Sequence, residues 1–329
     1  MIAFVSGGAG FIGSHLVLAL LERTGIEAVV VYDNLSSGTR AHLAAIGNGA
    51  DRVRFIHADI RDLADLTVAM RGADVVFHLA ANPDIAKAVS QPSIDFWNGT
   101  YLAHNVVEAM RVNGVRRIVY TSGSGVYGEC LDVKFSESFG PCFPISTYGA
   151  SKLACEALIC SYCHMFGLIG HAFRFANVVG PRQTHGVGYD FVRRLKQDPT
   201  KLRILGDGTQ RKSYIHIDDV LSAVFMVADR REGLDAYDVF NVASGDSVTV
   251  KEIADIVVAE SGLRPAPAVG GVTYEYTGGD RGWKGDVPRI EFNATKIQRL
   301  GWHPKRSSAE AIRDAVRAML GELENTTNQ

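Results

Sequence analysis

The sequence predicts an α/β fold: a doubly wound parallel sheet with a smaller C-terminal substrate-binding region. Two observations carry this prediction. Short apolar runs alternate with helical segments through the first half of the chain, which is typical of a parallel sheet with helices on both faces. The second half is less regular and richer in Gly, Pro and charged residues. Strands are expected at 2–6, 28–32, 53–56, 75–78, 116–121 and 168–174, and helices at 12–24, 62–71, 98–113 and 148–166.

In the second half, the pattern predicts helices separated by loops. Helical stretches are expected at 218–230, 250–261 and 307–323, and loops at 180–189, 205–212 and 264–288. We therefore expect a first domain over residues 1–175, with returning segments from about 212–245. The remainder, 176–329, would form the substrate-binding region.

The composition argues against several classes of protein. The 329 residues carry a net charge of −2 and are 47% hydrophobic, with no basic stripe for nucleic acid. No apolar run approaches the roughly 20 residues of a membrane span, and no basic leader precedes the first strand. We therefore expect a cytoplasmic protein without nucleic-acid or membrane partners.

The five cysteines are odd in number and lack the spacing of a disulfide framework, so reduced thiols are expected. Cys155, Cys160 and Cys163 do not share one face of their predicted helix. They are expected to be small buried side chains rather than zinc ligands, and no metal site is predicted.

A phosphate-binding turn is predicted where the first strand meets the first helix. Gly7, Gly10 and Gly13 recur every third residue between them. Glycines let the backbone turn tightly beside a pyrophosphate, and the helix N-terminus offers free N–H groups to the anion.

An acid at the end of the second strand indicates the kind of nucleotide. Asp33 follows Gly13 by twenty residues, where a carboxylate accepts hydrogen bonds from an adenosine ribose. An aspartate there also repels a 2′-phosphate, so the sequence favours NAD over NADP.

A tyrosine and a lysine four residues apart form the candidate catalytic pair. Tyr148 and Lys152 would lie on one face of a helix. A free phenol is a poor base at neutral pH, and a nearby ammonium stabilises its phenolate form. The tyrosine could then take a proton from a sugar hydroxyl while hydride leaves the carbon, with the lysine holding the nicotinamide ribose.

With these motifs, the chain resembles the extended short-chain dehydrogenases/reductases of the NAD-dependent nucleotide-sugar epimerase/dehydratase family. Within that family it most resembles the UDP-glucose (UDP-galactose) 4-epimerases. The resemblance rests on the following segments: G-G-A-G-F-I-G-S at 7–14, D-N-L-S-S-G at 33–38, A-D-I-R-D at 58–62, H-L-A-A at 78–81, S-x-V-Y-G ending at Gly128, S-T-Y-G-A-S-K at 146–152, R-F-A-N-V-V-G-P-R at 174–182, G-D-G-T-Q-R-K-S-Y-I-H at 206–216, R-G-W-K-G-D at 281–286 and L-G-W-H-P at 300–304.

The resemblance implies a Rossmann-type fold and a set of cofactor-binding residues. Those expected to contact NAD are Gly7, Gly10, Phe11, Ile12, Gly13, Asp33, Asn34, Ser36, Gly38, Asp59, Ile60, Leu79, Ala80, Ala81, Asn98, Ser122, Tyr148, Lys152, Phe175 and Val178.

The resemblance also implies a UDP-sugar substrate. Asn177 would meet the nucleotide diphosphate, and Arg182 follows the same loop. Lys212 aligns with an arginine that the family often uses on the pyrophosphate, and Arg211 beside it could take its place. With Arg281, these residues would form a diphosphate clamp.

One position departs from the family pattern. Relatives carry Ser or Thr three residues before the Val of V-Y-G, and this chain carries Gly123. The hydroxyl that bonds the reacting sugar oxygen could come from Ser122 or Ser124. Strand parity puts both on one side, and Ser124 is slightly favoured because it is nearer the open end of the turn.

The implied activity is epimerisation of a UDP-hexose at C4 through a transient 4-keto sugar, with Tyr148 as acid and base. The alternatives are a UDP-glucuronate 4-epimerase or decarboxylase, and a catalytically weak NAD and nucleotide-sugar-binding regulatory protein. The sequence does not distinguish the sugar.

The resemblance further implies a homodimer that pairs through a four-helix bundle. The segments 98–113 and 150–167 would form it, because they carry apolar residues beyond one helical stripe. These residues are Val106, Val107, Met110, Leu158, Ile159 and Met165.

Overall fold

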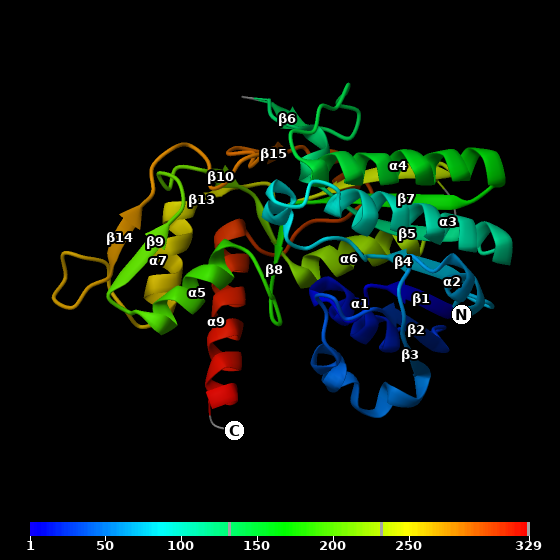
Figure 1. The fold of residues 1–329 in the computed structure, drawn as a ribbon, viewed down its shortest axis with the longest axis horizontal. Helices are drawn as coiled ribbons and strands as arrows, with labels where there is room; N and C mark the ends of the chain where they lie inside the picture. The colour runs from blue at the N-terminus through cyan, green and yellow to red at the C-terminus, as the bar shows by residue number, and fades with distance from the viewer. Residues whose placement is uncertain (131–132, 231–232, 328–329) are drawn as a thin grey trace. The chain divides into compact units, whose positions relative to one another are not determined.

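The computed structural model describes residues 1–130, 133–230 and 233–327 (Figure 1). These residues form two compact units, each built from separate stretches of chain. The first unit comprises Met1–Val126, Ser146–Arg174 and Leu221–Phe240, and the second comprises Tyr127–Ile145, Phe175–Val220 and Asn241–Gln329.

The elements follow one another in this order. The first half of the chain holds β1 (Ile2–Ser6), α1 (Phe11–Leu21), β2 (Ala28–Asp33), η1 (Arg40–Arg52), β3 (Val53–His57), α2 (Leu63–Ala69), β4 (Val75–His78), η2 (Ile85–Val89), η3 (Phe96–Thr100), α3 (Tyr101–Asn113), β5 (Arg117–Gly123), η4 (Ser124–Tyr127), β6 (Lys134–Phe135), α4 (Thr147–Phe166) and β7 (Ile169–Phe175). The second half holds β8 (Asn177–Val179), α5 (Val187–Gln197), β9 (Lys201–Ile204), β10 (Arg211–Lys212), β11 (Tyr214–His216), α6 (Ile217–Ala228), β12 (Tyr237–Val242), β13 (Val248–Thr249), α7 (Val250–Glu260), β14 (Thr273–Tyr276), β15 (Glu291–Phe292), α8 (Thr295–Arg299) and α9 (Ser308–Thr327).

A seven-stranded sheet forms the centre of the first unit, in the order β12-β7-β5-β4-β1-β2-β3. Strand β1 lies between β4 and β2 and is parallel to both, and β3 and β5 continue the parallel pairing on either side. The strand order reverses direction at β1, so the carboxyl ends of β1 and β4 mark the switch point where such sheets bind ligands. The predicted doubly wound parallel sheet is confirmed.

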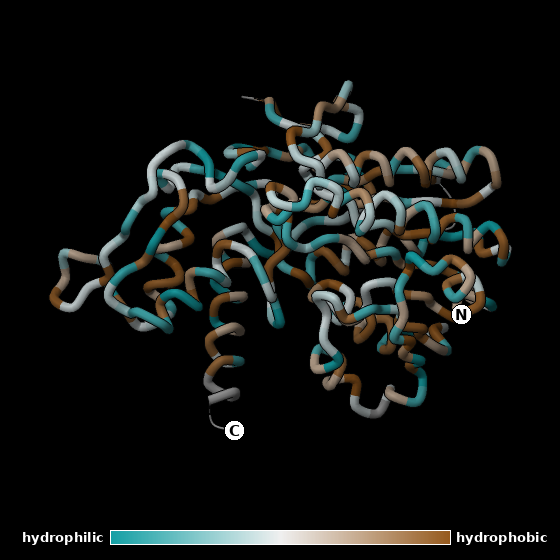
Figure 2. The backbone as a smooth tube through the Cα atoms, viewed as in Figure 1, coloured by the Kyte–Doolittle hydropathy of each residue, from teal (hydrophilic) through white to brown (hydrophobic). Residues whose placement is uncertain are grey.

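Apolar residues on alternate positions of these strands face opposite layers of helices. Phe4, Val76 and Tyr120 belong to the buried cluster that also contains residues of α2, α3 and α4. The neighbouring residues Val5 and Val31 are also fully buried, on the other face of the sheet. Figure 1 shows α3 and α4 side by side, and Figure 2 shows brown, hydrophobic stretches along the strands.

The predicted strands match the structure to within one or two residues, but several helices and loops differ. Helix α1 ends at Leu21 rather than residue 24. The expected helix over 98–113 begins with a π-helical turn at 96–100, inside which Asn98 leaves helical geometry (φ −102°, ψ 19°). The expected loop at 180–189 already contains the first turn of α5, and that at 264–288 contains β14.

The second unit packs α5, α7 and α9 around a core of its own. Phe191, Leu202 and Val257 are among the buried residues of this core. Short strands pair at its edges: β8 with β11, β9 with β14, β6 with β15, and β10 with β13. Of the predicted diphosphate-binding residues, Arg211 and Lys212 form β10, Asn177 begins β8, and Arg281 lies between β14 and β15.

In the described residues, no helix is long and apolar enough to span a membrane. Within the same residues, no group of three or more His, Cys, Asp and Glu side chains gathers in a way that could hold a metal ion. Cys155 and Cys163 on α4 are buried in the core of the first unit, while Cys160 on the same helix is partly exposed.

Candidate functional site

The glycine-rich turn joins β1 to α1 in the geometry expected of an anion-binding loop. Gly10 caps α1 in an extended conformation, and no side chain occupies the cap. The first N–H groups of a helix have no partner within it, and they carry the positive end of its dipole. The open cap therefore leaves these donors available to an anion.

Two of the glycines are required by close backbone approach. Gly7 has φ +74°, and a Cβ added to it would lie 2.7 Å from the amide nitrogen of Ala80. A Cβ on Gly13 would lie 2.1 Å from the carbonyl oxygen of Gly7. Any side chain at either position would force the turn open.

Asp33 ties this turn to the end of β2. Its carboxylate, which is 8% exposed, accepts hydrogen bonds from the backbone N–H groups of Ala9 (2.9 Å) and Leu35 (2.8 Å). Gly38 lies against the same turn, since a Cβ there would be 2.7 Å from the carbonyl carbon of Ala9. Each Asp33 oxygen keeps a lone pair that a ribose hydroxyl could use.

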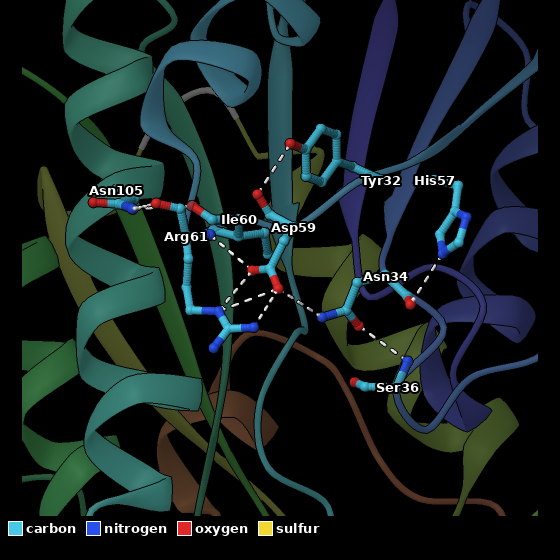
Figure 3. Close-up of polar contacts among 8 residues, drawn as sticks. All are labelled: Tyr32, Asn34, Ser36, His57, Asp59, Ile60, Arg61 and Asn105. Carbon is cyan, nitrogen blue, oxygen red and sulfur yellow. Dashed lines mark hydrogen bonds and ion pairs between the residues drawn. The ribbon is translucent and has the colours of Figure 1, made fainter.

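Polar contacts connect the ends of β2 and β3 (Figure 3). Asn34 donates to the Asp59 carboxylate at 3.1 Å, and Arg61 approaches the same carboxylate to 2.6 Å. The Arg61 hydrogen bonds lower the pKa of Asp59 to about 2, so this carboxylate stays charged at neutral pH. Ser36 donates its backbone N–H to the Asn34 side chain at 3.0 Å. Asn34, Ser36 and Asp59, which belong to two separate motifs of the sequence, thus lie together at the carboxyl ends of β2 and β3.

Tyr148 and Lys152 lie on the first two turns of α4. Ser146 caps this helix by accepting the N–H of Gly149. Lys152 is 5% exposed, and its Nζ donates to the Thr121 carbonyl at 2.6 Å. The same Nζ lies 5.6 Å from the centroid of the Tyr148 ring and 5.0 Å from that of Tyr120. The predicted ammonium–phenol pair is present, with the ammonium held by the end of β5.

A small pocket lies beside this pair. It brings the predicted residues Ala81 and Asn98 together with Tyr148 and Lys152. Asn82, Asp95, Gly99 and Ser151 complete its lining.

Asp95 links the pocket to the start of α4. It is 1% exposed and accepts hydrogen bonds from Asn82 (2.8 Å) and Thr147 (2.6 Å). Because Thr147 directly precedes Tyr148, its hydrogen bond to Asp95 fixes the start of α4 against the segment that follows β4. The sequence analysis missed Asp95 because it belongs to no motif.

The two candidate serines have different surroundings. Ser122 is buried and donates its hydroxyl to Glu156 at 2.5 Å, and Glu156 forms a buried ion pair with Arg174 at 2.6 Å. Ser124 begins η4 and is partly exposed. Nothing lies within 4 Å of a Cβ built on Gly123, so this position has room for a side chain. The Ser122 hydroxyl is committed to Glu156, which the sequence analysis overlooked although it follows Lys152 by one helical turn.

We predict that alanine substitutions of the two serines have different effects. Ser124→Ala should lower turnover several-fold because it removes the partly exposed hydroxyl. Ser122→Ala should instead lower the free energy of unfolding by about 1–3 kcal/mol, because a buried hydrogen bond to a charged group is lost. Gly123→Ser should keep or raise turnover. Steady-state kinetics and urea unfolding of the three variants test this, and full turnover in both alanine variants would leave Tyr148 and water as the only proton carriers.

His78 is a buried neutral group near Lys152. It ends β4, is 1% exposed, shares a 2.7 Å hydrogen bond with Ser6, and stacks on Tyr120. Burial, followed by the charge of Lys152, lowers the pKa of His78 to about 3. The folded protein therefore keeps this imidazole neutral, while the unfolded chain protonates it below about pH 6.5.

This difference predicts a pH-dependent stability. The unfolded state binds more protons between about pH 6.5 and 3, so His78 contributes stability that is present above pH 6.5 and is lost as the pH falls. Between pH 7 and 5.5, His78 should account for about 1 kcal/mol of the decrease in unfolding free energy. Urea midpoints of the wild type and His78→Gln at both pH values measure it, and equal decreases in the two proteins would refute the assignment.

In the second unit, the remaining predicted residues cluster around β8 and β11. Phe175 is 5% exposed, Val178 pairs with Ile215 in register, and Asn177 donates its side-chain amide to the Ser213 carbonyl at 3.1 Å. Asn177 is thus brought next to the strand that follows Lys212.

The predicted basic residues of the second unit do not all gather at one point. Lys212 forms an ion pair with Asp286, and Arg281 donates to the backbone carbonyl of Asp286 at 3.1 Å. Arg211 turns away to the carbonyl of Ser247 at 3.0 Å.

Arg182 lies outside this group. It adopts φ +61°, its backbone N–H donates to Glu322 at 2.8 Å, and burial lowers the pKa of its guanidinium. Lys212 and Arg281 thus both contact Asp286, Lys212 through the carboxylate and Arg281 through the backbone carbonyl.

Comparison with known proteins places these features in a family. Residues 3–243 match the family model described as the NAD dependent epimerase/dehydratase family. A putative UDP-glucose 4-epimerase from Methanocaldococcus jannaschii is 32% identical, covering 96% of this chain and 97% of that protein.

Solved structures agree with this placement. A UDP-galactose 4-epimerase is 38% identical with a TM-score of 0.84, covering 98% of this chain and 100% of that one. A Thermus thermophilus UDP-glucose 4-epimerase in complex with NAD is 33% identical with a TM-score of 0.83, covering 98% and 99%. The chain therefore belongs to the NAD-dependent epimerase/dehydratase family.

Proposed function

We propose that this protein is an NAD-dependent enzyme that inverts the C4 configuration of a UDP-hexose, interconverting UDP-glucose and UDP-galactose. The observation that carries this proposal is the Tyr148–Lys152 pair, with Lys152 buried and held 5.6 Å from the tyrosine ring. The relatives named above, which are UDP-glucose and UDP-galactose 4-epimerases, support the choice of sugar.

The residues at the carboxyl ends of the strands fit NAD. The backbone leaves no room for a Cβ at Gly7 or Gly13, and the N-terminus of α1 carries no side-chain cap. We assign the pyrophosphate to this turn, the adenosine ribose to Asp33, and the nicotinamide ribose to Lys152. When bound, NAD supplies the acceptor and donor of hydride.

The protein's own chemistry is proton transfer at one hydroxyl. Tyr148 would take the proton of the C4 hydroxyl as the C4–H bond breaks, and return it when the 4-keto sugar is reduced from its other face. The charge of Lys152 stabilises the phenolate that forms in between. Because Lys152 is anchored to the Thr121 carbonyl, its charge stays at a fixed position relative to Tyr148.

We assign the UDP moiety to the second unit. Asn177, Lys212 and Arg281 offer amide, ammonium and guanidinium donors, which suit diphosphate oxygens. Ser124 is the hydroxyl that we assign to the C4 oxygen, in place of the family's residue at position 123.

A substrate panel tests the proposal. Purified protein is incubated separately with UDP-glucose, UDP-galactose, UDP-GlcNAc and UDP-glucuronate, and products are identified by NMR. We expect UDP-glucose and UDP-galactose to interconvert. Conversion of UDP-glucuronate alone would assign the protein to the uronate 4-epimerases or decarboxylases, and no conversion of any sugar would indicate a binding or regulatory protein.

We also propose a homodimer through α3 and α4. Of the apolar residues that suggested it, Val106, Val107, Met110 and Ile159 instead lie in the core of their own unit. Support now comes from exposed apolar side chains on the same helices: Val112 is 57% exposed and Met165 is 71% exposed. Sedimentation at micromolar concentration should give twice the 35.6 kDa chain mass, and a monomer would refute the dimer.

A further inference from the structure

Arg281, which we assign to the substrate diphosphate, already binds a carboxylate of the protein. Its two terminal nitrogens donate to the two oxygens of Glu129, at 2.8 and 3.0 Å. Glu129 directly follows the V-Y-G motif, 152 residues away in sequence. A guanidinium binds a carboxylate and a phosphate through the same parallel N–H pair, so Arg281 cannot give this pair to both at once.

The acidic partner of Lys212 is held more firmly. The side chain of Asp286 is 9% exposed and accepts the ammonium of Lys212 through one oxygen. Its other oxygen accepts the backbone N–H of Gly282 at 3.2 Å. Asp286 therefore has a structural role in its own loop that does not depend on Lys212.

The carboxylate near Arg211 is also committed elsewhere. Glu252 lies 3.6 Å from Arg211, but it accepts the backbone N–H of Thr249 at 2.6 Å and its hydroxyl at 2.9 Å. The first of these bonds, together with the Glu252 N–H that donates to the Thr249 hydroxyl oxygen at 3.1 Å, forms the capping box at the start of α7. Glu252 would stay in place whatever Arg211 binds.

Glu129 differs from both. Its side chain is 27% exposed, and the described residues give it no hydrogen-bond donor other than Arg281. Because the side chains of Arg281 and Glu129 are 35% and 27% exposed, water can solvate the Glu129 carboxylate once it is released, so it is not left buried without a partner. Asp280 also lies 3.7 Å from Arg281, but its side chain is 73% exposed and, in the described residues, accepts no hydrogen bond from Arg281. Among the carboxylates that accept hydrogen bonds from these cations, Glu129 is the one that a ligand can displace.

We propose that Glu129 competes with the substrate diphosphate for Arg281 and thereby sets the affinity of the protein for nucleotide diphosphates. This inference rests on the proposed function, since it assumes that Arg281 binds the diphosphate. Ligands that bring two adjacent negative oxygens to Arg281 displace Glu129, whereas ligands with fewer charges leave Glu129 bound to Arg281. Glu129 is in this sense a specificity-determining residue, although it touches no substrate.

Titration calorimetry with UDP as the ligand tests this competition. The proteins are the wild type, Glu129→Gln, Arg281→Ala and the double variant, all at one ionic strength. Glu129→Gln should bind UDP about three- to tenfold more tightly, because the competing charge is gone. In the Arg281→Ala background, the same substitution should give no gain.

A matched control removes a different carboxylate from the same unit. Glu260 forms an ion pair with Arg317 at 2.7 Å on the α7–α9 surface, and Glu260→Gln should bind UDP like the wild type. Equal or weaker UDP binding by Glu129→Gln would overturn the inference, as would a gain that persists without Arg281. If the wild type itself binds no UDP, the proposed function fails first and this inference fails with it.

Discussion

Tyr148→Phe should lower turnover by roughly 10²–10⁴-fold, the usual contribution of a positioned acid–base group. The substitution removes the hydroxyl but keeps the ring, so the contact of that ring with the Lys152 ammonium can persist. Binding of NAD should therefore be unchanged, because Lys152 remains anchored to the Thr121 carbonyl. Steady-state rates with UDP-galactose, measured beside the NAD content of the purified variant, separate the two effects.

The matched control for this variant is Tyr162→Phe on the same helix. Tyr162 donates its hydroxyl to Glu108 at 3.2 Å and is not among the residues of the pocket beside Tyr148. Its loss should leave turnover within about twofold of the wild type. Near-normal turnover in Tyr148→Phe would remove that residue from the mechanism.

Gly13→Ala should largely abolish NAD binding, with a loss of about 100-fold or more in affinity. The added Cβ would lie 2.1 Å from the Gly7 carbonyl oxygen and 2.7 Å from the Gly8 Cα. Both are backbone atoms that no rotamer change can move, so the turn itself must open. Overpacking of this kind should also lower the free energy of unfolding by about 1–3 kcal/mol.

A glycine with open surroundings provides the control. Nothing lies within 4 Å of a Cβ built on Gly321 in α9, and its backbone is helical. Gly321→Ala should leave NAD affinity intact and slightly stabilise the helix. Calorimetric titration of both variants with NAD decides the question, and wild-type affinity in Gly13→Ala would show that the turn does not bind the pyrophosphate.

The strands of the sheet were predictable because their signal is local. Val29, Val30 and Val31 form a β-branched run that is buried on both faces, as a central parallel strand requires. The Tyr148–Lys152 pair was also predictable from local sequence, because residues four apart share one face of a helix wherever that helix packs. Motif residues after the strands also gather as predicted, because parallel strands end at one edge.

What the sequence did not reveal depends on contacts between distant residues. The sequence predicts a loop where β14 forms, because the partner strand β9 lies about 70 residues earlier and leaves no local signal. The acidic partners of Lys212 and Arg281 lie 74 and 152 residues away, so no spacing rule could identify them. Helix α5 is a different kind of omission: the predicted loop at 180–189 overlaps its first turn, and Phe191, Val192 and Leu195, which do have helical spacing, lie beyond that loop in a stretch without a predicted element.

The parity argument for the serines was incomplete for a similar reason. It placed Ser122 and Ser124 on one side of the strand but gave no information about which groups they meet. Only the fold brings Glu156, 34 residues on, to the hydroxyl of Ser122.

The fate of the C4 hydrogen tests the central claim most directly. UDP-galactose carrying deuterium at C4 is incubated with the protein in ordinary water, and the product is examined by NMR and mass spectrometry. If the hydrogen leaves C4 and returns to the same carbon within one site, as the account predicts, the UDP-glucose formed retains its deuterium at C4. UDP-glucose that carries hydrogen from water at C4, or no UDP-glucose at all, would contradict it.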